Sequence, residues 1–316
     1  MRLRAATLAV CALVGLAGCG GGDDDDARIG RGPPPAGGGG ELTYALPSLP
    51  ATLDPLAARA RPGMTVVRQL YDPLIARLAG PYGQSSPQPG LALTARPSRD
   101  RTVWRLTLRP GVRFQDGTPF NAAAVLANSR RWQSDPVGRS LLPDLFAVDA
   151  PRPDEIRFLL DNPVPDLLHT LADPRLGIVS PRALERENDQ GGRFLEAPTR
   201  SGTGPFQAGP EGPGRLMLSR FSGWWGSPTG LGPALDSVTF VVAPKPSQRL
   251  RMLRDGSVQV ADPLGRARLR AADADPLLVT VGGPPKGIGM EGSVRGIDSA
   301  RAVPVLSGVW LTHLRG

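Results

Sequence analysis

Alternating apolar and polar positions mark a strand in the first half of the chain. Trp104, Leu106 and Leu108 fall on one face of an extended segment, and polar residues separate them, which is the period of a half-buried strand. Pro110 and Gly111 follow directly and favour a turn. This stretch therefore predicts a strand that ends at a turn.

A second short strand and a helix are predicted after that turn. Residues 112–114 give a brief apolar alternation, and the Asp-Gly pair at 116–117 suits a tight turn. Asn121 is placed as an N-cap, and residues 122–132 carry apolar side chains at helical spacing. The order strand, strand, helix is expected here.

The same periodicities predict further elements along the chain. Strands are predicted to begin at Thr43 and to span residues 156–160, 176–180, 215–221 and 236–242. Helices are predicted at residues 64–78, at 164–171, after Ser180 with Pro181 in the first turn, and at 246–255 before Gly256. This order predicts an α+β fold with mixed sheets.

The charge balance is basic, but it does not indicate a nucleic-acid partner. Lys plus Arg number 37 against 29 Asp plus Glu, a net charge of +8. The basic residues are scattered among acidic ones, with no basic stripe interleaved with aromatic residues and no helix-turn-helix or zinc-finger spacing. We interpret these charges as solvated surface and expect no nucleic-acid binding.

The first residues have the form of a bacterial lipoprotein signal. Arg2 and Arg4 precede an apolar run over residues 5–17, and Cys19 follows the sequence Leu-Ala-Gly. The run is too short for a permanent membrane helix. We therefore expect residues 1–18 to be a signal peptide, with cleavage before Cys19 and lipid attachment there.

Residues 19–40 are predicted to be a disordered Gly/Asp/Pro tether. The four aspartates at 23–26 lack the ordered geometry of a calcium loop and are interpreted as spacer. Cys11 is interpreted as a small apolar residue of the signal. Cys19 would then be the single cysteine after cleavage, which excludes an intramolecular disulfide and a cysteine-based metal site.

Catalytic chemistry has little support in the sequence. The histidines are His169, between leucines on a predicted helix, and His313, near the end, and each is interpreted as a surface or packing residue. The Gly-Thr-Gly sequence at 202–204 lacks the lysine and the spacing of a phosphate-binding loop and is interpreted as a bend that enters a strand. The sequence predicts no enzyme, no cofactor and no metal site.

Six ordered motifs resemble one family of extracytoplasmic solute-binding proteins of ABC importers, family 5, which serves peptides, nickel and related solutes. The motifs are LDP at 53–55, LYDPL at 70–74, PGLA at 89–92, LRPGVRFQDGTPFNA at 108–122, SGTGPF at 201–206 and WWG at 224–226. The resemblance covers residues 41–262, and the tail at 293–311 resembles the closing strand region of the family.

The resemblance implies a bilobed fold of the periplasmic-binding-protein type II class. It implies a first lobe formed by residues 41–75, 179–280 and 288–316, and a subdomain formed by residues 76–178 that is inserted into it and packed on it. Family members are longer, and only a short segment follows residue 278 where the second lobe would begin. We therefore expect most of the C-terminal lobe to be missing.

The function implied is capture of a peptide or similar small solute for delivery to ABC permease subunits. The domain would be extracytoplasmic and held at the cell membrane by the lipid anchor. The alternative is a truncated solute-binding-like lipoprotein with a structural or interaction role and no transport, because a single lobe covers only one side of a ligand.

The resemblance places ligand contacts in the loop after the LDP motif. The expected ligand-binding residues are Ala58, Arg59, Ala60, Arg61, Pro62 and Gly63. Arg61 is either a bidentate contact to a carboxylate or an exposed loop arginine. Tyr71, Trp104, Trp224 and Trp225 are either packing residues or platforms for the ligand, and packing is favoured.

Overall fold

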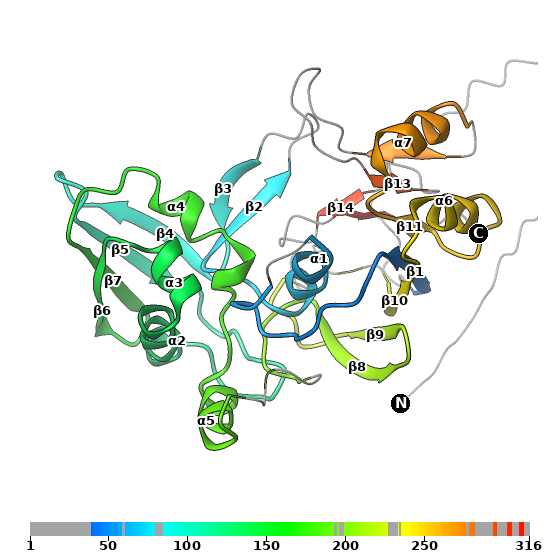
Figure 1. Ribbon diagram of the computed structural model, residues 1–316. Helices are drawn as coiled ribbons and strands as arrows, with labels where there is room; N and C mark the ends of the chain where they lie inside the picture. The colour runs from blue at the N-terminus through cyan, green and yellow to red at the C-terminus, as the bar shows by residue number, and fades with distance from the viewer. Residues whose placement is uncertain are drawn as a thin grey trace, which may run out of the picture. The chain divides into compact units, whose positions relative to one another are not determined.

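Four β-sheets and the helices that cover them make up the part of the chain that the structure describes (Figure 1). The structure is a computed structural model. It describes residues 39–58, 61–79, 85–192, 195, 199–226, 233, 235–275, 278–281, 293–295, 302–304 and 310–312. Helices and strands are mixed along the chain, which confirms the α+β fold with mixed sheets.

The largest sheet has seven strands in the order β12-β13-β11-β1-β10-β9-β8. Its strands are β1 (Glu41–Leu46), β8 (Phe206–Gly212), β9 (Arg215–Arg220), β10 (Ser237–Val242), β11 (Val260–Ala261), β12 (Val279–Val281) and β13 (Ser293–Arg295). Strand β1 pairs in parallel with both β10 and β11, whereas the other pairs are antiparallel. The sheet thus joins segments that lie far apart in the sequence.

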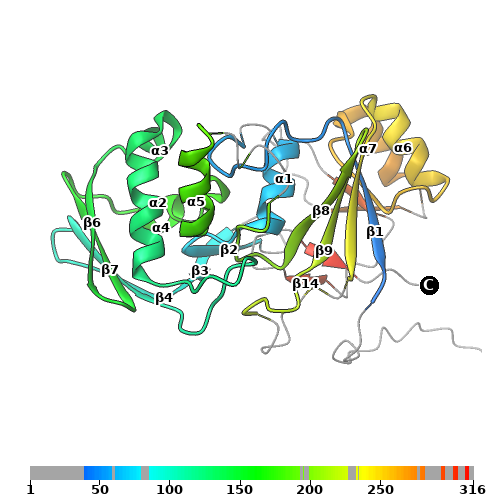
Figure 2. The same cartoon turned by 90° about the horizontal axis from the view of Figure 1, so that it is seen from below.

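Helices cover both faces of this sheet (Figure 2). Leu42, Tyr44 and Leu46 of β1 share one hydrophobic core with α1 (Arg61–Leu70). Ala45 points to the opposite face, whose core includes side chains of α6 (Pro246–Arg254) and α7 (Gly265–Asp273). The period of two along β1 therefore separates the two cores.

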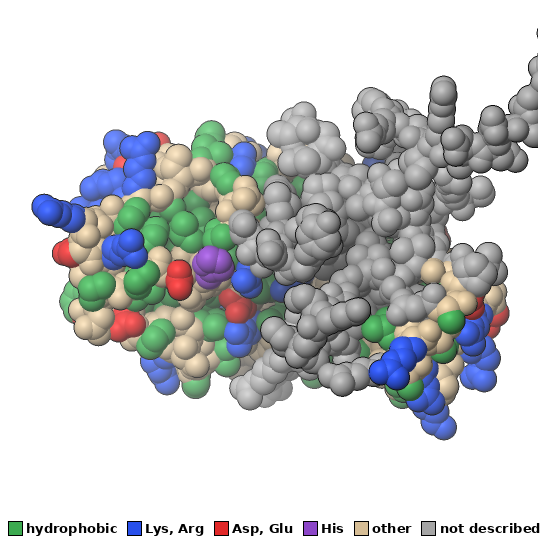
Figure 3. Space-filling view, turned by 90° about the horizontal axis from the view of Figure 1, so that it is seen from above, with side chains coloured by type: hydrophobic (Ala, Val, Ile, Leu, Met, Phe, Trp, Pro, Cys, Tyr) green, Lys and Arg blue, Asp and Glu red, His purple; other side chains and the backbone are tan. Residues whose placement is uncertain are grey.

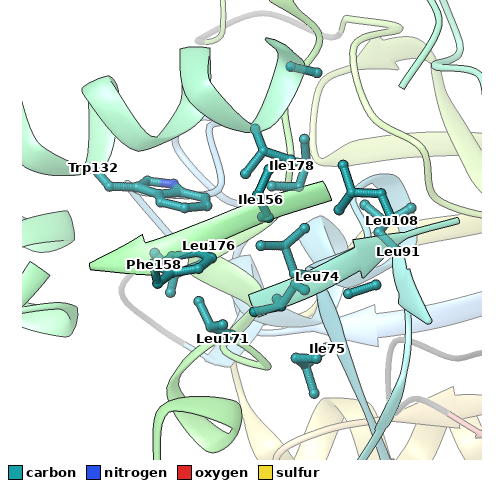
Figure 4. Close-up of a cluster of buried hydrophobic side chains, with 14 of the residues drawn as sticks. Leu74, Ile75, Leu91, Leu108, Trp132, Ile156, Phe158, Leu171, Leu176 and Ile178 are labelled. Atoms are coloured by element: carbon teal, nitrogen blue, oxygen red, sulfur yellow. The ribbon is translucent and has the colours of Figure 1, made fainter. Parts of the chain in front are cut away.

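The second-largest sheet has four antiparallel strands in the order β4-β5-β7-β6. Its strands are β4 (Ala92–Pro97), β5 (Val103–Leu108), β6 (Leu145–Arg152) and β7 (Glu155–Leu160). Helix α2 (Ala122–Ser134) packs against β6 and β7, and Trp132 lies over Ile156 and Phe158 in the core that Figure 4 shows. The alternation predicted for Trp104, Leu106 and Leu108 is confirmed, since all three side chains are buried on β5.

Shorter elements complete the description. They are β2 (Ile75–Ala79), β3 (Ser85–Pro89), α3 (Pro136–Leu141), α4 (Leu167–Thr170), η1 (Pro174–Leu176), α5 (Pro181–Asp189), β14 (Ala302–Pro304) and β15 (Trp310–Thr312). Strands β2 and β3 pair with each other, as do β14 and β15.

Several predicted boundaries are confirmed. Asn121 caps α2 by accepting a hydrogen bond from the backbone N–H of Ala124 at 3.2 Å, and Ser180 caps α5 in the same way from Ala183 at 3.1 Å. Strands at 156–160, 215–220 and 237–242 lie where the alternation predicts them. Helix α6 ends just before Gly256, whose φ of 76° is suited to glycine.

The predicted helix over 64–78 is wrong at its end. Helix α1 stops at Leu70, and residues 75–79 form strand β2 instead. Pro73 explains the break, because proline disfavours the helical conformation of the residue before it and lacks an N–H to donate. Buried apolar residues continue beyond the break, so the apolar pattern extends past the helix.

Three other predicted elements differ in the structure. Residues 112–114 make one isolated bridge, between Arg113 and Pro119, because the tight turn at 116–117 closes immediately. The helix predicted at 164–171 is shortened to α4. The strand predicted at 176–180 is absent: the backbone N–H and C=O of Val179 bond to the side chain of Asn128 rather than to a neighbouring strand.

Candidate functional site

The loop that precedes α1 is fixed at its beginning by Asp54. One carboxylate oxygen of Asp54 accepts a hydrogen bond from the N–H of Leu56 at 3.0 Å, and the other lies 2.5 Å from Nη2 of Arg131 on α2. The N–H of Asp54 donates to the hydroxyl of Thr52 at 3.0 Å. These contacts tie the loop of the first motif to the helix that covers the four-stranded sheet.

The residues predicted to contact the ligand are placed in different environments. Ala58 and Gly63 are buried, Pro62 is half-buried, and Arg61 is exposed at the start of α1. Arg59 and Ala60 lie outside the described residues. Of the described members of this set, Arg61 is the one with a charged side chain. Ligand contact by this loop stays a prediction.

Arg61 connects the start of α1 to the seven-stranded sheet. Its Nη1 lies 3.8 Å from Oδ1 of Asp262, which directly follows β11. The side chain of Arg61 is 43% exposed and that of Asp262 is 6% exposed. The arginine can therefore reach solvent on one side while it balances a buried carboxylate on the other.

Three further arginines gather along the same face of α1 and beside it. Arg68 lies two helical turns after Arg61, Arg77 lies on β2, and Arg175 lies on η1, which contacts α1. Arg175 is paired with Asp173, whose carboxylate accepts from its Nε at 2.9 Å and its Nη2 at 2.7 Å.

Asp173 is a counter-charge of both Arg175 and Arg68. Burial acts to raise the pKa of Asp173, but hydrogen bonds from Arg175 and the charges of Arg175 and Arg68 outweigh it, so the pKa lies below its ordinary value. Asp173 is therefore ionised at neutral pH and already bound on both oxygens by Arg175.

The guanidinium groups of Arg68 and Arg77 have no such partner. The Nε of each is buried without a hydrogen-bond acceptor, and neither group forms an ion pair or hydrogen bond with a residue that the structure describes. Burial lowers the pKa of Arg68, Asp173 opposes this, and the charges of Arg77 and Arg61 lower the pKa further. An unsatisfied buried donor costs about 1–3 kcal/mol, more when charged, so two in one place need an explanation.

A second polar cluster lies at the other end of α1, around Asp72. Its buried Oδ2 accepts hydrogen bonds from Trp225 Nε1 at 2.8 Å, Thr203 Oγ1 at 3.2 Å and Trp224 Nε1 at 3.3 Å. Burial raises the pKa of Asp72 to about 6, although the hydrogen bonds from both tryptophans and Thr203 and the charge of Arg109 act against it. This cluster joins three of the sequence motifs and leaves the indole N–H groups occupied, which agrees with packing roles for both tryptophans.

Two glycines of the SGTGPF motif explain why that motif follows α1 so closely. A Cβ atom on Gly202 would lie 1.9 Å from the carbonyl oxygen of Leu70, and one on Gly204 would lie 2.5 Å from its carbonyl carbon. The N–H of Gly204 donates to that carbonyl oxygen at 2.9 Å. The bend before β8 is confirmed, and its purpose is a close backbone approach.

Other kinds of site find no support in the described part of the chain. No group of three or more His, Cys, Asp or Glu side chains in it could hold a metal ion. No helix in it is long and apolar enough to span a membrane. His169 is exposed on α4, and His313 lies outside the described residues. Figure 3 shows Lys and Arg side chains in separate groups on one face, alternating with hydrophobic and acidic ones.

Comparison with known proteins gives the same class of protein as the fold. The chain is 31% identical over 218 residues to the glutathione-binding protein GsiB of Escherichia coli K12, a match over 67% of this chain and 40% of that protein. The structure matches MoaA of A. tumefaciens R10 in complex with mannopinic acid (TM-score 0.67, 26% identity, 78% of this chain and 50% of the other). It also matches the fold of DppA of Helicobacter pylori in complex with the peptide STSA (TM-score 0.65, 22% identity, 77% and 50%).

These likenesses give a fold of the periplasmic-binding-protein type II class. The family model "Bacterial extracellular solute-binding proteins, family 5 Middle" matches residues 86–291, which is more than half of the chain. The chain therefore belongs to family 5 of the bacterial extracellular solute-binding proteins. It spans about 40% of the length of the curated relatives that it matches.

Proposed function

We propose that this chain binds a peptide or similar small solute and delivers it to the permease of an ABC importer. The match of the family 5 model to residues 86–291 carries this proposal. The relatives named above bind glutathione, mannopinic acid and a peptide, so the family accommodates solutes of different chemistry. The loop before α1 and the arginines along α1 are the residues that we expect to meet the solute.

We propose a division of the chain that the arrangement of its sheets supports. The strands of the four-stranded sheet come from residues 92–160, and those of the seven-stranded sheet come from residues 41–46 and 206–295. This supports a subdomain at 76–178 inserted into a first lobe that is formed by residues 41–75, 179–280 and 288–316.

Solute binding is tested by isothermal calorimetry of the full chain in detergent. The panel contains dipeptides, tripeptides, glutathione and nickel chelates. We expect saturable heat with a dissociation constant in the micromolar range for at least one solute. A chain that is folded by circular dichroism but gives no heat up to millimolar concentrations of every solute would contradict the proposal.

Attachment to the cell membrane by lipid on Cys19 is a separate proposal. It is supported by the apolar run and the Leu-Ala-Gly-Cys sequence at 16–19. Expression in a bacterium with labelled palmitate tests it: the wild type should carry label, and Cys19→Ala should lose it. Cys11→Ala is the matched control and should remain labelled. Equal labelling of the wild type and Cys19→Ala would refute the anchor.

A further inference from the structure

Among the described residues beside α1, arginines outnumber carboxylates. Arg61, Arg68, Arg77 and Arg175 stand against the carboxylates Asp173 and Asp262. Each carboxylate lies against one arginine, Asp173 against Arg175 and Asp262 against Arg61. The two arginines that remain, Arg68 and Arg77, come from different elements, a helix and a strand.

Burial makes this arrangement unfavourable unless a further group completes it. Both side chains are half-buried, and the Nε of each has lost contact with water without gaining an acceptor from any described residue. Guanidinium groups elsewhere in the described chain are hydrogen-bonded where they are buried: Arg249, for example, donates to the carbonyl oxygens of Ala243, Pro244 and Pro263. The chain thus provides acceptors for one buried arginine and not for these two.

The chemistry of the missing partner follows from the donors. Because the Nε atoms are buried, the terminal Nη groups are the donors that a solute can reach, and their two parallel N–H bonds form a fork that fits the two oxygens of a carboxylate. Arg68 and Arg77 together offer two such forks. The carboxylate of Asp173 lies nearby and limits the total positive charge. We therefore expect the partner to carry one or two carboxylates and to be a small molecule rather than a polyanion.

We propose that Arg68 and Arg77 bind a carboxylate group of the solute, so that the solutes of this protein are small carboxylic acids. This rests on the proposed function and adds the class of solute to it. Both arginines are positioned by the fold before the solute arrives, because α1 is packed on the seven-stranded sheet and β2 is paired with β3. Pre-positioning reduces the loss of side-chain entropy on binding.

The first experiment measures thermal shift and calorimetry of the full chain with succinate, and with succinamide as its neutral counterpart, at constant ionic strength. Succinate should raise the melting temperature in a saturable way, because a ligand that binds only the folded state stabilises it. Succinamide should not. Equal effects of succinate and succinamide, or no saturation by succinate, would overturn the proposal. Tighter binding of inorganic phosphate than of succinate would also overturn the choice of a carboxylate.

The second experiment compares variants. Arg68→Gln and Arg77→Gln should each weaken succinate binding tenfold or more, and Arg68→Lys should weaken it less, because it keeps the charge but loses the fork. Arg99→Gln is the matched control, since Arg99 is exposed between β4 and β5, and it should change the affinity less than twofold. Unchanged affinity in folded Arg68→Gln and Arg77→Gln would overturn the proposal.

Failure of this inference is distinguishable from failure of the proposed function. If a solute of the calorimetry panel binds with the same affinity to the wild type and to Arg68→Gln, the chain binds solutes but not through these arginines. If succinate binds through Arg68 and Arg77 while no solute of the panel binds, the carboxylate site is retained and the peptide-type function is refuted.

Discussion

The four-stranded sheet and the surface beside α1 differ in whether their buried charged side chains have partners. On the sheet, the buried carboxylate of Glu155 is held by both Arg105 and Arg152. Beside α1, Arg68 and Arg77 are left without an acceptor among the described residues. Buried charges that are paired in one region and lack an acceptor among the described residues of the other support the proposal that a charged group binds beside α1.

The largest effect on stability is expected at Asn128, on the helix that covers the four-stranded sheet. Asn128 on α2 is buried and bonds to both the N–H and the C=O of Val179, at 3.0 and 2.7 Å. Asn128→Ala leaves two buried backbone groups without partners, so we expect a loss of about 4 kcal/mol in the free energy of unfolding. Urea denaturation measures it, with Asn162→Ala, at an exposed asparagine, as the control. A loss no larger than that of the control would contradict the comparison.

Asp72 is a buried carboxylate that accepts several hydrogen bonds, and yet burial makes its ionised form unfavourable. Its folded pKa of about 6 lies above the ordinary 3.8, so its contribution to stability is fully present below pH 3.8 and is lost as the pH rises through 6. At about 1.4 kcal/mol per pKa unit, the loss is about 3 kcal/mol.

Unfolding of the wild type and Asp72→Asn at pH 4 and pH 7 measures this contribution. The Asp72→Asn variant lacks the titration of Asp72. The contributions of the other carboxylates are the same in both proteins and cancel when their stabilities are subtracted. We expect the stability of Asp72→Asn relative to the wild type to rise by about 2.4 kcal/mol between the two pH values, because a small part of the loss has already occurred at pH 4. Parallel pH profiles would show that Asp72 titrates normally in the folded protein.

A smaller loss of stability is expected at Glu155, the buried and paired carboxylate of the four-stranded sheet. Glu155→Gln removes the charge that both arginines contact, and we expect a loss of about 2 kcal/mol, since hydrogen bonds to charged groups contribute about 1.5–3 kcal/mol. Asp149→Asn is the control, because Asp149 and Arg157 form a more exposed pair, whose loss we expect to cost less. Equal effects in urea unfolding would show that burial of Glu155 adds nothing.

The smallest effect is expected at Arg68, whose buried Nε has no acceptor among the described residues. We expect Arg68→Gln to change the stability of the solute-free protein by no more than about 0.5 kcal/mol, because loss of packing by the side-chain stem is offset by removal of an unsatisfied buried donor. A loss of about 2 kcal/mol or more, measured by urea unfolding, would show that Arg68 stabilises the fold and would remove the contrast between the regions.

Much of the fold could be predicted because it depends on local patterns. The alternation in β5, the cap at Asn121 and the turn at Gly256 are properties of neighbouring residues, and the structure has them. The helix predicted to continue to residue 78 failed because the apolar pattern crosses Pro73 unchanged. The strand predicted at 176–180 failed because its backbone groups have scattered partners that are distant in sequence: Val179 bonds to the side chain of Asn128, and the N–H groups of Ile178 and Ser180 donate to the carbonyls of Asp72 and Ser201.

The candidate site was less predictable for a similar reason. Arg61 was identified through a motif, but Arg68 and Arg77 have no signal in the sequence that separates them from the other arginines. What distinguishes them is that the buried Nε of each has no acceptor among the described residues, which depends on the packing of α1, β2 and η1. The role of Asp72 had a signal, since Asp72, Thr203 and both tryptophans lie in motifs of one family, yet the motifs alone do not show that these side chains meet.

Arginine resonances in a nitrogen–proton correlation spectrum test the central claim most directly. The Nε–H signals of Arg68 and Arg77 are assigned from their loss in Arg68→Lys and Arg77→Lys, and the full chain is titrated with succinate. We predict that both signals move downfield and saturate together, while that of Arg99 stays in place. Saturation at other arginines, with the signals of Arg68 and Arg77 unchanged, would contradict the account.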